Sequence, residues 1–337
     1  MIKKAIQRVI ERKSLSQSEM IDVMNQIMEG HATDAQIASF ITALRMKGET
    51  IDEITGAAKV MREKATKIVV ESGTLILDVV GTGGDQSNTF NISTCTAIVL
   101  AAGGVVVAKH GNRGVSSSCG SADVLKALGV NIEASKEQVE ECIKQCNIGF
   151  LFAPSLHGAM KYAIGPRREM GVRTLFNLLG PLTNPAGANH QLLGVFDHDL
   201  VEPIAKVLVN LGIQRALVVH GEDGLDEITT TARTYVAEVN QKMIETYYID
   251  PKDYGMAYAS PDDLKGGHSE RNAEIIRNVL SGQAGAHRNI VLLNAASAFY
   301  IVGKSLSILE GIKQAGEVID SGQARKTLEQ LIRTSNQ

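Results

Sequence analysis

The first 65 residues carry apolar side chains at the spacing of an α-helix. A capping box, in which a hydroxyl residue precedes a Glu or Gln by three positions, marks three helix starts: Ser16 to Glu19, Thr33 to Gln36 and Thr50 to Glu53. Each box is followed by apolar residues three to four positions apart, and a further helix is expected near 2–11. We therefore predict a small all-helical N-terminal domain and assign residues 1–70 to it.

From about residue 74 the pattern changes to short apolar runs that alternate with helix-like segments. The runs expected to form strands lie at 75–80, 105–108, 148–152, 191–196 and 215–220. Uniformly apolar strands that alternate with helices are typical of a parallel sheet buried on both faces. The pattern predicts an α/β domain over residues 71–337, with a mostly parallel sheet covered by helices.

Other segments complete this domain. Helices are expected at 135–146 and 199–212, and at the end of the chain near 270–281, 287–302 and 306–332. Residues 233–249 alternate between apolar and polar side chains, which predicts a short antiparallel addition at a sheet edge.

The composition narrows the range of partners. The net charge is −3, Trp is absent and aromatic residues make up 4% of the chain, so nothing points to nucleic acid as a partner. The longest apolar run, 97–108, is too short to span a bilayer, and we expect no membrane partner. The first residues lack a signal-peptide pattern, and the four cysteines lack metal-binding spacing. We therefore expect a cytoplasmic protein with reduced thiols.

Two glycine- and hydroxyl-rich turns follow consecutive predicted strands. The first is Gly81-Thr-Gly-Gly-Asp85, with Thr89-Phe-Asn-Ile-Ser-Thr94 opening the next helix. The second is Lys109-His-Gly-Asn-Arg113, with Ser116 to Asp123 opening the helix after it. A glycine turn that leads into a helix N-terminus presents backbone N–H groups to an anion. The first turn has neither the Walker A nor the Rossmann glycine pattern. Together they predict a ligand with two separated phosphate groups.

The residues alone leave several roles open. The first turn is either structural or a ligand site, and Asn91, Ser93 and Thr94 could cap the helix, bind phosphate or do both. Lys109 and Arg113 place two cations at the end of a buried strand, where burial is expensive without an anion nearby. This favours a phosphate site over a solvated loop.

Further candidate residues belong to the same sheet edge and to a basic segment. Asp226-Glu227 follows the strand at 215–220. Carboxylates beside phosphates are typical ligands of Mg²⁺, so a metal site is favoured over a solvated turn. An arginine of 165–173 either holds a substrate carboxylate or forms a surface salt bridge. For His110 and His157, a structural role is favoured over that of a general base.

Taken together, these segments resemble the anthranilate phosphoribosyltransferase family. The similarity is carried by Gly81-Thr-Gly-Gly-Asp85, Asn91-Ile-Ser-Thr94, Lys109-His-Gly-Asn-Arg113, Gly120-Ser-Ala-Asp123, Arg173 to Pro185 and Gly224-Leu-Asp-Glu227, in this order along nearly the whole chain. It implies transfer of the phosphoribosyl group of 5-phosphoribosyl 1-pyrophosphate (PRPP) to the amine of anthranilate, which is a step of tryptophan biosynthesis. The products would be N-(5-phosphoribosyl)anthranilate and pyrophosphate. The family also implies a homodimer formed through the helical domain, against which segment 165–185 would pack.

The resemblance assigns a role to each matching position but names no catalytic acid or base. Contact with PRPP is implied for Gly81, Gly84, Asp85, Thr89, Asn91, Ile92, Ser93, Thr94, Lys109, His110, Gly111, Asn112, Arg113, Gly114, Val115, Ser116, Ser117 and Ser121. Contact with anthranilate is implied for Gly81, His110, Asn112, His157 and Arg167. Two Mg²⁺ ions per monomer would be held by Ser93, Asp226 and Glu227.

Two departures from the family pattern, and two alternative functions, complete the sequence-based expectations. Gly158 stands where the family is expected to have Pro, and Cys119 stands where a small residue or Gly is frequent, so both bear on loop rigidity. One alternative is a pyrimidine nucleoside phosphorylase-like enzyme, which would use free phosphate. The other is a non-catalytic relative that binds nucleic acid. The motif at 109–113 and the Asp226-Glu227 pair favour the diphosphate substrate.

Overall fold

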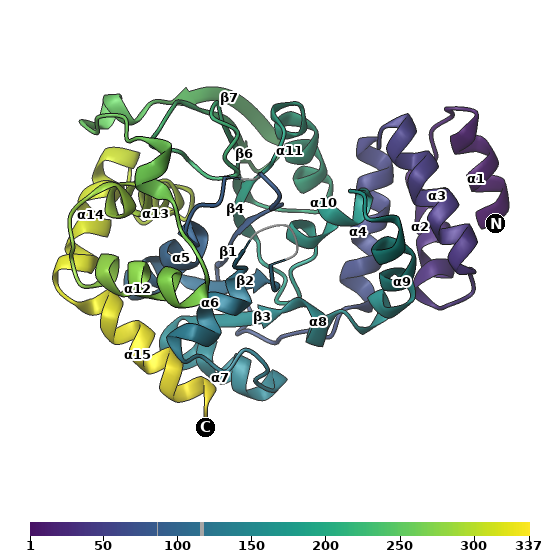
Figure 1. Cartoon of the computed structure of the whole chain (residues 1–337). Helices are drawn as coiled ribbons and strands as arrows, with labels where there is room; N and C mark the ends of the chain where they lie inside the picture. Colours follow the sequence, from purple (N-terminus) through teal and green to yellow (C-terminus); the bar gives the residue numbers. More distant parts are fainter. Residues whose placement is uncertain (86, 115–117) are drawn as a thin grey trace.

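The computed structural model describes residues 1–85, 87–114 and 118–337. A helical bundle lies beside a larger α/β body, whose sheet runs through its centre (Figure 1). The bundle is formed by α1 (Ile2–Ile10), α2 (Gln17–Met28), α3 (Asp34–Lys47) and α4 (Ile51–Lys64). The predicted fold class, a helical N-terminal domain followed by an α/β domain, is confirmed.

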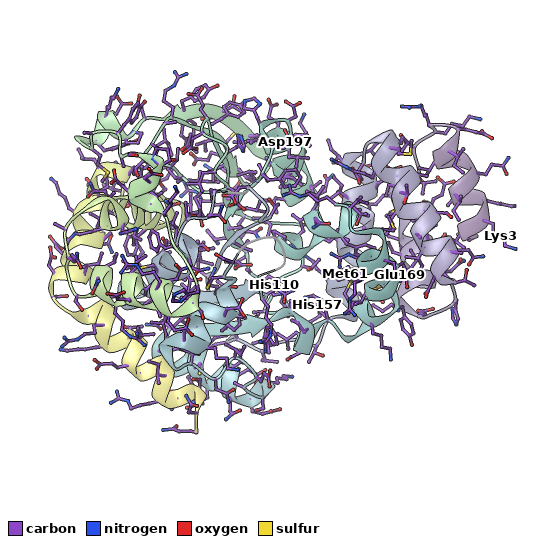
Figure 2. All side chains as sticks on the ribbon, in the orientation of Figure 1. Lys3, Met61, His110, His157, Glu169 and Asp197 are labelled. Carbon is purple, nitrogen blue, oxygen red and sulfur yellow. The ribbon has the colours of Figure 1, made fainter. Side chains whose placement is uncertain are left out.

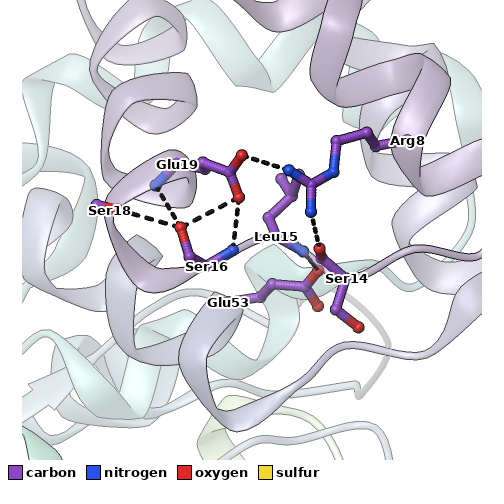
Figure 3. Close-up of polar contacts among 7 residues, drawn as sticks. All are labelled: Arg8, Ser14, Leu15, Ser16, Ser18, Glu19 and Glu53. Atoms are coloured by element: carbon purple, nitrogen blue, oxygen red, sulfur yellow. Dashed lines mark hydrogen bonds and ion pairs between the residues drawn. The ribbon is translucent and has the colours of Figure 1, made fainter.

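The predicted capping boxes start α2, α3 and α4. In the first, Ser16 Oγ accepts from the Glu19 N–H at 3.3 Å and Glu19 Oε2 accepts from the Ser16 N–H at 2.8 Å (Figure 3). The side chain of Glu53 does more than cap its own helix. It accepts from the Leu15 N–H at 2.8 Å and pairs with Lys47 at 2.9 Å, and both charged side chains are buried. The box residue of α4 therefore also anchors the segment that precedes α2.

The strands of the described residues pair in the order β3-β2-β1-β4-β5-β6-β7. The parallel strands are β1 (Ile76–Gly81), β2 (Val106–Gly111), β3 (Ile148–Phe152), β4 (His190–Gly194) and β5 (Arg215–Gly221). β6 (Thr234–Asn240) and β7 (Met243–Ile249) add to β5 in antiparallel fashion. The expected parallel sheet with an antiparallel edge is confirmed.

Helices cover both faces of the sheet (Figure 1). Leu77 and Val79 face one hydrophobic cluster, to which α5 (Ile92–Ala102), α12 (Ser269–Leu280), α13 (Ala286–Ile301), α14 (Ile308–Asp320) and α15 (Gln323–Ser335) contribute. Leu193 and Val218 face a second cluster, which contains α11 (Val201–Asn210) and the apolar faces of the bundle helices. Because this second cluster is continuous, the bundle and the sheet share one core on that side.

The chain between β3 and β4 runs from the sheet to the bundle and back to the sheet (Figure 1). It forms α8 (Ala153–Leu156), the 3₁₀ turn η1 (Gly158–Met160), α9 (Lys161–Met170) and α10 (Leu175–Leu182). α9 packs against α2 and α3, and α10 packs against α3, α4 and β2. From the residues alone, this stretch was interpreted as a basic segment, and its helices were not predicted.

The remaining elements are short or surround the sheet. α6 (Ser121–Leu128) and α7 (Lys136–Cys146) connect β2 to β3, and η2 (His198–Leu200) precedes α11. η3 (Pro251–Tyr254) and η4 (Pro261–Leu264) lie between β7 and α12. Across the described ranges, no helix combines the length and the apolar character that crossing a membrane requires.

Two predicted boundaries were wrong. β2 continues to Gly111, so Lys109 and His110 belong to the strand and not to the turn after it. Their polar side chains were taken as the end of the strand, but buried partners satisfy them there. The helix expected at 306–332 is two helices, because Gly322 adopts a left-handed φ of 75° between α14 and α15.

Candidate active site

The carboxyl ends of β1 and β5 bring the first glycine turn and the Asp226-Glu227 pair into contact. The Gly83 N–H donates to Asp226 Oδ2 at 2.7 Å, and the Ser93 N–H donates to Glu227 Oε1 at 3.1 Å. A Cβ at Gly81 would overlap the Asp226 carboxylate, so glycine permits this close approach. The carboxylate pair therefore lies between the turn and the start of α5.

Burial and mutual repulsion shape this carboxylate pair. The pKa of Asp226 is raised well above its usual value, first by burial and then by the charges of Asp85 and Glu227. Burial is also the largest cause that raises the pKa of Glu227, to about 7. A cation bound between two neighbouring carboxylates relieves their mutual repulsion and favours their ionised forms. Such a pair is therefore a favourable site for a cation.

The oxygen atoms of Asp226 and Glu227 suit Mg²⁺, which needs few ligands from the protein, better than they suit a metal bound only by protein side chains. Within the described ranges, no group of three or more His, Cys, Asp or Glu side chains is arranged to hold a metal ion. Mg²⁺ is typically bound through one or two carboxylates, with phosphate and water oxygens completing the octahedron. Asp226 and Glu227 could supply those carboxylates at the edge where the glycine turns lie.

Lys109 is buried at this edge and is surrounded by acceptors. Its Nζ donates to the Val79 carbonyl at 2.7 Å and to Ser93 Oγ at 3.2 Å. Burial lowers its pKa, while the charges of Asp78 and Glu227 oppose that effect. Arg113, the other cation of the motif, pairs with Glu133 at 3.2 Å. Carboxylates of the protein therefore lie near both cations, and the predicted contact of these cations with phosphate stays a prediction.

A buried polar network that sequence analysis missed supports β1 and β2. Asp78 accepts from the His110 N–H at 3.2 Å and from Asn184 Nδ2 at 2.8 Å, and Asn184 Nδ2 also donates to the Ala108 carbonyl at 2.8 Å. Burial raises the pKa of Asp78 to about 6. The available signal was a single Asp in the middle of the apolar run at 75–80.

The imidazoles of His110 and His157 form a pair whose tautomers follow from their partners. His110 Nδ1 lies 3.0 Å from the Gly180 carbonyl, which can only accept, so we place the proton of His110 on Nδ1. His110 Nε2 then accepts from His157 Nε2–H at 3.2 Å. The remaining nitrogen, His157 Nδ1, is a buried acceptor without a partner in the described part of the chain.

Both imidazoles are neutral at physiological pH. Burial lowers the pKa of His110 to about 3 and that of His157 to about 4. They lie between the α/β body and the helices that carry Met61 and Glu169 (Figure 2). The pair can therefore orient a ligand by hydrogen bonding without bringing positive charge.

Arg167 lies on α9, which packs against α2 and α3. Its guanidinium carbon is 5.1 Å from the centroid of the Phe176 ring, and burial lowers its pKa. No acidic side chain in the described ranges forms an ion pair with Arg167, so the salt-bridge alternative is not observed. A half-buried guanidinium on an aromatic ring suits an incoming carboxylate.

The start of α5 differs from the expected cap. The Asn91 side chain does not cap the helix, because its Nδ2 donates to the Cys119 carbonyl at 3.1 Å and its Oδ1 accepts from Asn272 at 3.0 Å. Asn91 thereby joins the second turn to α12. Ile92 is buried in the core and can offer a ligand only its backbone, whereas Thr94 Oγ1 is buried without a partner in the described residues.

The second turn is closed by its own hydrogen bonds. Asp123 Oδ2 accepts from the N–H groups of Gly114 and Gly120, each at 2.9 Å. The Asn112 carbonyl accepts from Ser121 Oγ at 3.3 Å, and a Cβ at Gly111 would overlap that hydroxyl. Val115, Ser116 and Ser117, which were expected to contact phosphate, lie outside the described residues.

The remaining predicted positions border the first turn or the histidine pair. Thr89 forms an isolated antiparallel bridge with Lys265, and Asp85 Oδ2 accepts from Ser87 Oγ at 2.5 Å. Gly158 is exposed, and a Cβ there would meet nothing within 4 Å, so glycine is not required by packing. Cys119 is buried, and its Sγ contacts Asn91 Oδ1 at 3.4 Å.

Comparison with known proteins agrees with this arrangement. Residues 73–325 match the α/β domain of a glycosyl transferase family, and residues 3–65 match its helical bundle domain. The chain is 58% identical over 336 residues to the anthranilate phosphoribosyltransferase of Acetivibrio thermocellus, covering 100% of this chain and 97% of that relative. Its identity to the Geobacter sulfurreducens enzyme is 56% over 350 residues, covering 100% of both chains.

Solved structures of the same enzyme superpose closely on this chain. The structure from Thermus thermophilus has a TM-score of 0.93 at 43% identity and covers 99% of both chains. A structure from Saccharomyces cerevisiae in complex with PRPP and Mg has a TM-score of 0.90 at 28% identity and covers 99% of this chain and 98% of that one. The chain therefore belongs to the anthranilate phosphoribosyltransferases of this glycosyl transferase family.

Proposed function

We propose that this protein transfers the phosphoribosyl group of PRPP to the amine of anthranilate, in the second step of tryptophan biosynthesis from chorismate. The observation that carries the proposal is the buried Asp226-Glu227 pair, which contacts both the first glycine turn and the start of α5. It is supported by full-length similarity to relatives of this name and by the likeness to a yeast enzyme in complex with PRPP and Mg.

PRPP would bind along the carboxyl ends of β1 and β2. We assign the pyrophosphate and ribose to the first turn and the start of α5, through Gly81, Gly84, Asp85, Thr89, Asn91, Ile92, Ser93 and Thr94. The remaining phosphate and ribose oxygens would contact Lys109 to Ser117 and Ser121. The Thr94 hydroxyl, which is buried without a partner in the described residues, supports this assignment.

Two Mg²⁺ ions per monomer would lie at the same edge, one held by Ser93 and Glu227 and the other by Asp226 and Glu227. Mg²⁺ would neutralise charge on the pyrophosphate leaving group. The raised pKa values of both carboxylates support a cation there. The Lys109 ammonium lies 3.2 Å from Ser93 Oγ and would repel a Mg²⁺ ion bound to that hydroxyl. The ionised carboxylate of Glu227 would offset this repulsion.

Anthranilate would bind between α9 and the histidine pair. We assign its carboxylate to Arg167, and its ring and amine to a pocket lined by Gly81, His110, Asn112 and His157. His157 Nδ1 is a buried acceptor without a partner in the described residues, and a hydrogen bond from the amine would require the groups that cover this atom to move. An aromatic amine is neutral at pH 7 and needs little activation, so we assign no catalytic acid or base.

Positioning then accounts for the reaction. With separate anchors for the two substrates, the amine faces C1 of the ribose while the pyrophosphate departs on the other side. Positive charge that develops on the ribose carbon, as in other glycosyl transfers, is compatible with the acidic edge. The chain's own contribution is to hold both substrates in line and to stabilise the leaving group with backbone donors.

We also propose that the two domains divide near residue 70, and that the protein is a cytoplasmic homodimer formed through its helical domain. The packing of α9 against α2 and α3 supports the assignment of segment 165–185 to the helical side. Two large apolar side chains of the bundle, Ile10 and Met46, are 66% and 71% exposed. Sedimentation velocity would test the dimer, and a double substitution Ile10→Lys with Met46→Lys should yield monomers if this face is the interface.

A fluorescence assay tests the proposed reaction. With protein, Mg²⁺ and PRPP, the fluorescence of anthranilate should fall with time, and EDTA should stop the fall until Mg²⁺ is restored in excess. The pair of substitutions Asp226→Asn and Glu227→Gln should abolish it. Folded wild-type protein that leaves anthranilate unchanged would refute the proposal, and phosphate-dependent cleavage of a pyrimidine nucleoside would favour the phosphorylase alternative.

A further inference from the structure

Arg173, between α9 and α10, reaches across to the first glycine turn. Its Nη2 donates to the Gly84 carbonyl, and its guanidinium carbon lies 4.4 Å from the centroid of the Phe196 ring. Nothing in the proposed reaction uses this arginine. Sequence analysis quoted it as the first residue of a motif but gave it no role.

Phe196 is itself tied to the same turn. The Phe196 N–H donates to Thr82 Oγ1 at 3.1 Å, and the Thr82 N–H donates to the Gly194 carbonyl at 2.9 Å. The ring that supports Arg173 and the turn that Arg173 contacts are therefore one connected unit. An arginine above an aromatic ring loses part of its freedom, which makes its hydrogen bond to Gly84 more directional.

The hydrogen bond from Arg173 to the Gly84 carbonyl fixes the orientation of the whole peptide group between Gly84 and Asp85. In a trans peptide the C=O and the next N–H point in opposite directions, so the Asp85 N–H is turned away from Arg173. The preceding residue is held as well, because the Gly83 N–H donates to Asp226 at 2.7 Å. Gly83 and Gly84 have φ values of 68° and 77°, a region that glycine reaches without strain.

Glycine at position 84 suits both the left-handed backbone conformation and the close approach of Arg173. A Cβ at Gly84 would overlap the Arg173 guanidinium. The turn is therefore held between Arg173 on one side and Asp226 on the other, in a conformation that a free glycine turn would adopt only part of the time.

We propose that Arg173, supported by Phe196, is a positioning residue that sets the first glycine turn for the diphosphate of PRPP before the substrate arrives. This inference rests on the proposed function. Arg173 does not touch the substrate; it keeps the turn in its binding-competent conformation. A turn that is competent only a tenth of the time without Arg173 would bind about tenfold more weakly.

Substrate kinetics and pyrophosphate binding test this inference. Arg173→Met should raise the apparent KM for PRPP about tenfold, while kcat and the KM for anthranilate change less than about threefold. The affinity for inorganic pyrophosphate with Mg²⁺, measured by calorimetry, should fall by the same factor. Arg173→Lys keeps a donor and should restore part of the loss. Arg325→Met, an exposed arginine of α15, is the control and should match the wild type.

Substitution of the supporting ring separates positioning from direct charge. Phe196→Leu leaves the charge in place and should weaken pyrophosphate binding in the same direction. The double variant should be no weaker than Arg173→Met alone, because both act through one turn. If Phe196→Leu binds like the wild type and the Arg173→Met defect vanishes at high salt, Arg173 acts as a phosphate ligand and the inference is overturned.

Amide hydrogen exchange measures the conformational stability of the first glycine turn in the absence of substrate. Amides of residues 82–85 should exchange faster in Arg173→Met and in Phe196→Leu than in the wild type, whereas Arg325→Met should not differ. Unchanged exchange there would overturn the inference. Because this readout needs neither anthranilate nor turnover, a wild-type enzyme that fails the fluorescence assay but shows this pattern would contradict the proposed reaction and not the role of Arg173 in the turn.

Discussion

At the scale of single residues, burial decides the charge state of the site. His110 and His157 are neutral because their surroundings disfavour the imidazolium, and Asp226 and Glu227 resist ionisation for the same reason. Arg167 is the half-buried cation that no protein carboxylate in the described ranges neutralises. In the proposed reaction, the site would offer a cation to one substrate and a pair of carboxylates, which favour a metal ion, to the other.

Arg167→Ala should separate the two substrates. Because the guanidinium is assigned to the anthranilate carboxylate, its loss should raise the apparent KM for anthranilate at least about tenfold. The KM for PRPP should change far less. Initial rates with each substrate varied in turn give both KM values. Arg167→Lys should raise the KM for anthranilate less than Arg167→Ala does, because lysine keeps the positive charge but loses the planar guanidinium that binds a carboxylate through two hydrogen bonds. Equal effects on both constants would remove Arg167 from its assigned role.

The depressed pKa of His157 predicts how stability depends on pH. In the unfolded chain this imidazole takes up a proton near its ordinary pKa of 6.5, whereas in the folded protein it stays neutral down to about pH 4. The free energy of unfolding should therefore fall as the pH drops from 6.5 to 4, by up to about 1.4 kcal/mol per pH unit for this group. His157→Gln removes the titrating group and should make that fall shallower.

Urea denaturation at several pH values measures this difference. The glutamine amide can still donate to His110 Nε2, so the variant keeps the hydrogen bond of His157. Parallel profiles for His157→Gln and the wild type would show that His157 is not held neutral.

At the scale of elements, Arg62 of α4 joins the bundle to two helices of the α/β domain. Its Nε donates to the Leu182 carbonyl at 2.7 Å and its Nη1 to the Leu211 carbonyl at 3.2 Å, so it caps the ends of α10 and α11 together. Burial lowers its pKa to about 10, which leaves it charged at physiological pH. A cation is favoured at the carboxyl end of a helix, and here the single cation of Arg62 stabilises the carboxyl ends of two helices.

Arg62→Met should destabilise the protein by about 1–3 kcal/mol, because two partly buried carbonyls lose their donor. The methionine keeps most of the apolar volume of the side chain, so the loss reports mainly the hydrogen bonds. Chemical denaturation measures the change, and Lys59→Met, on an exposed position of the same helix, should stay within about 0.5 kcal/mol of the wild type. A similar small effect for Arg62→Met would show that α10 and α11 do not depend on it.

Elements were predictable where a local pattern determines them. The capping boxes at Ser16, Thr33 and Thr50 and the apolar strands of the parallel sheet have strong local signals, and the structure confirms them. α9 and α10 were not predicted, because each contains a proline within its span and their apolar residues serve tertiary contacts. The extension of β2 through Lys109 was missed for a related reason, since Asp78 stabilises it from a distant part of the sequence.

The candidate site was predictable only in part. The glycine turns and Asp226-Glu227 were found because glycines and carboxylates after strands carry a clear chemical meaning. Asn184 and Arg173 were not given roles, because their partners Asp78 and Gly84 are far away in the sequence. The tautomers of the histidine pair depend on the Gly180 carbonyl, which only the fold brings near them.

At the scale of the whole molecule, the bundle and the sheet edge supply different halves of one site. The segment with Arg167 and α10 packs on the bundle, while the glycine turns and carboxylates belong to the sheet (Figure 1). The two halves meet where His110 of β2 contacts the Gly180 carbonyl of α10 and where Arg173 contacts Gly84. In the proposed reaction, this arrangement would keep two substrate anchors apart while fixing their relative position, as a transfer between two bound substrates requires.

The balance of the reaction tests this account most directly. Anthranilate consumed and pyrophosphate released should be measured in the same sample, with the product identified by mass spectrometry. The account predicts one pyrophosphate for each anthranilate and a product with the mass of N-(5-phosphoribosyl)anthranilate. Consumption of anthranilate without pyrophosphate, or no consumption by folded protein supplied with Mg²⁺ and PRPP, would contradict it.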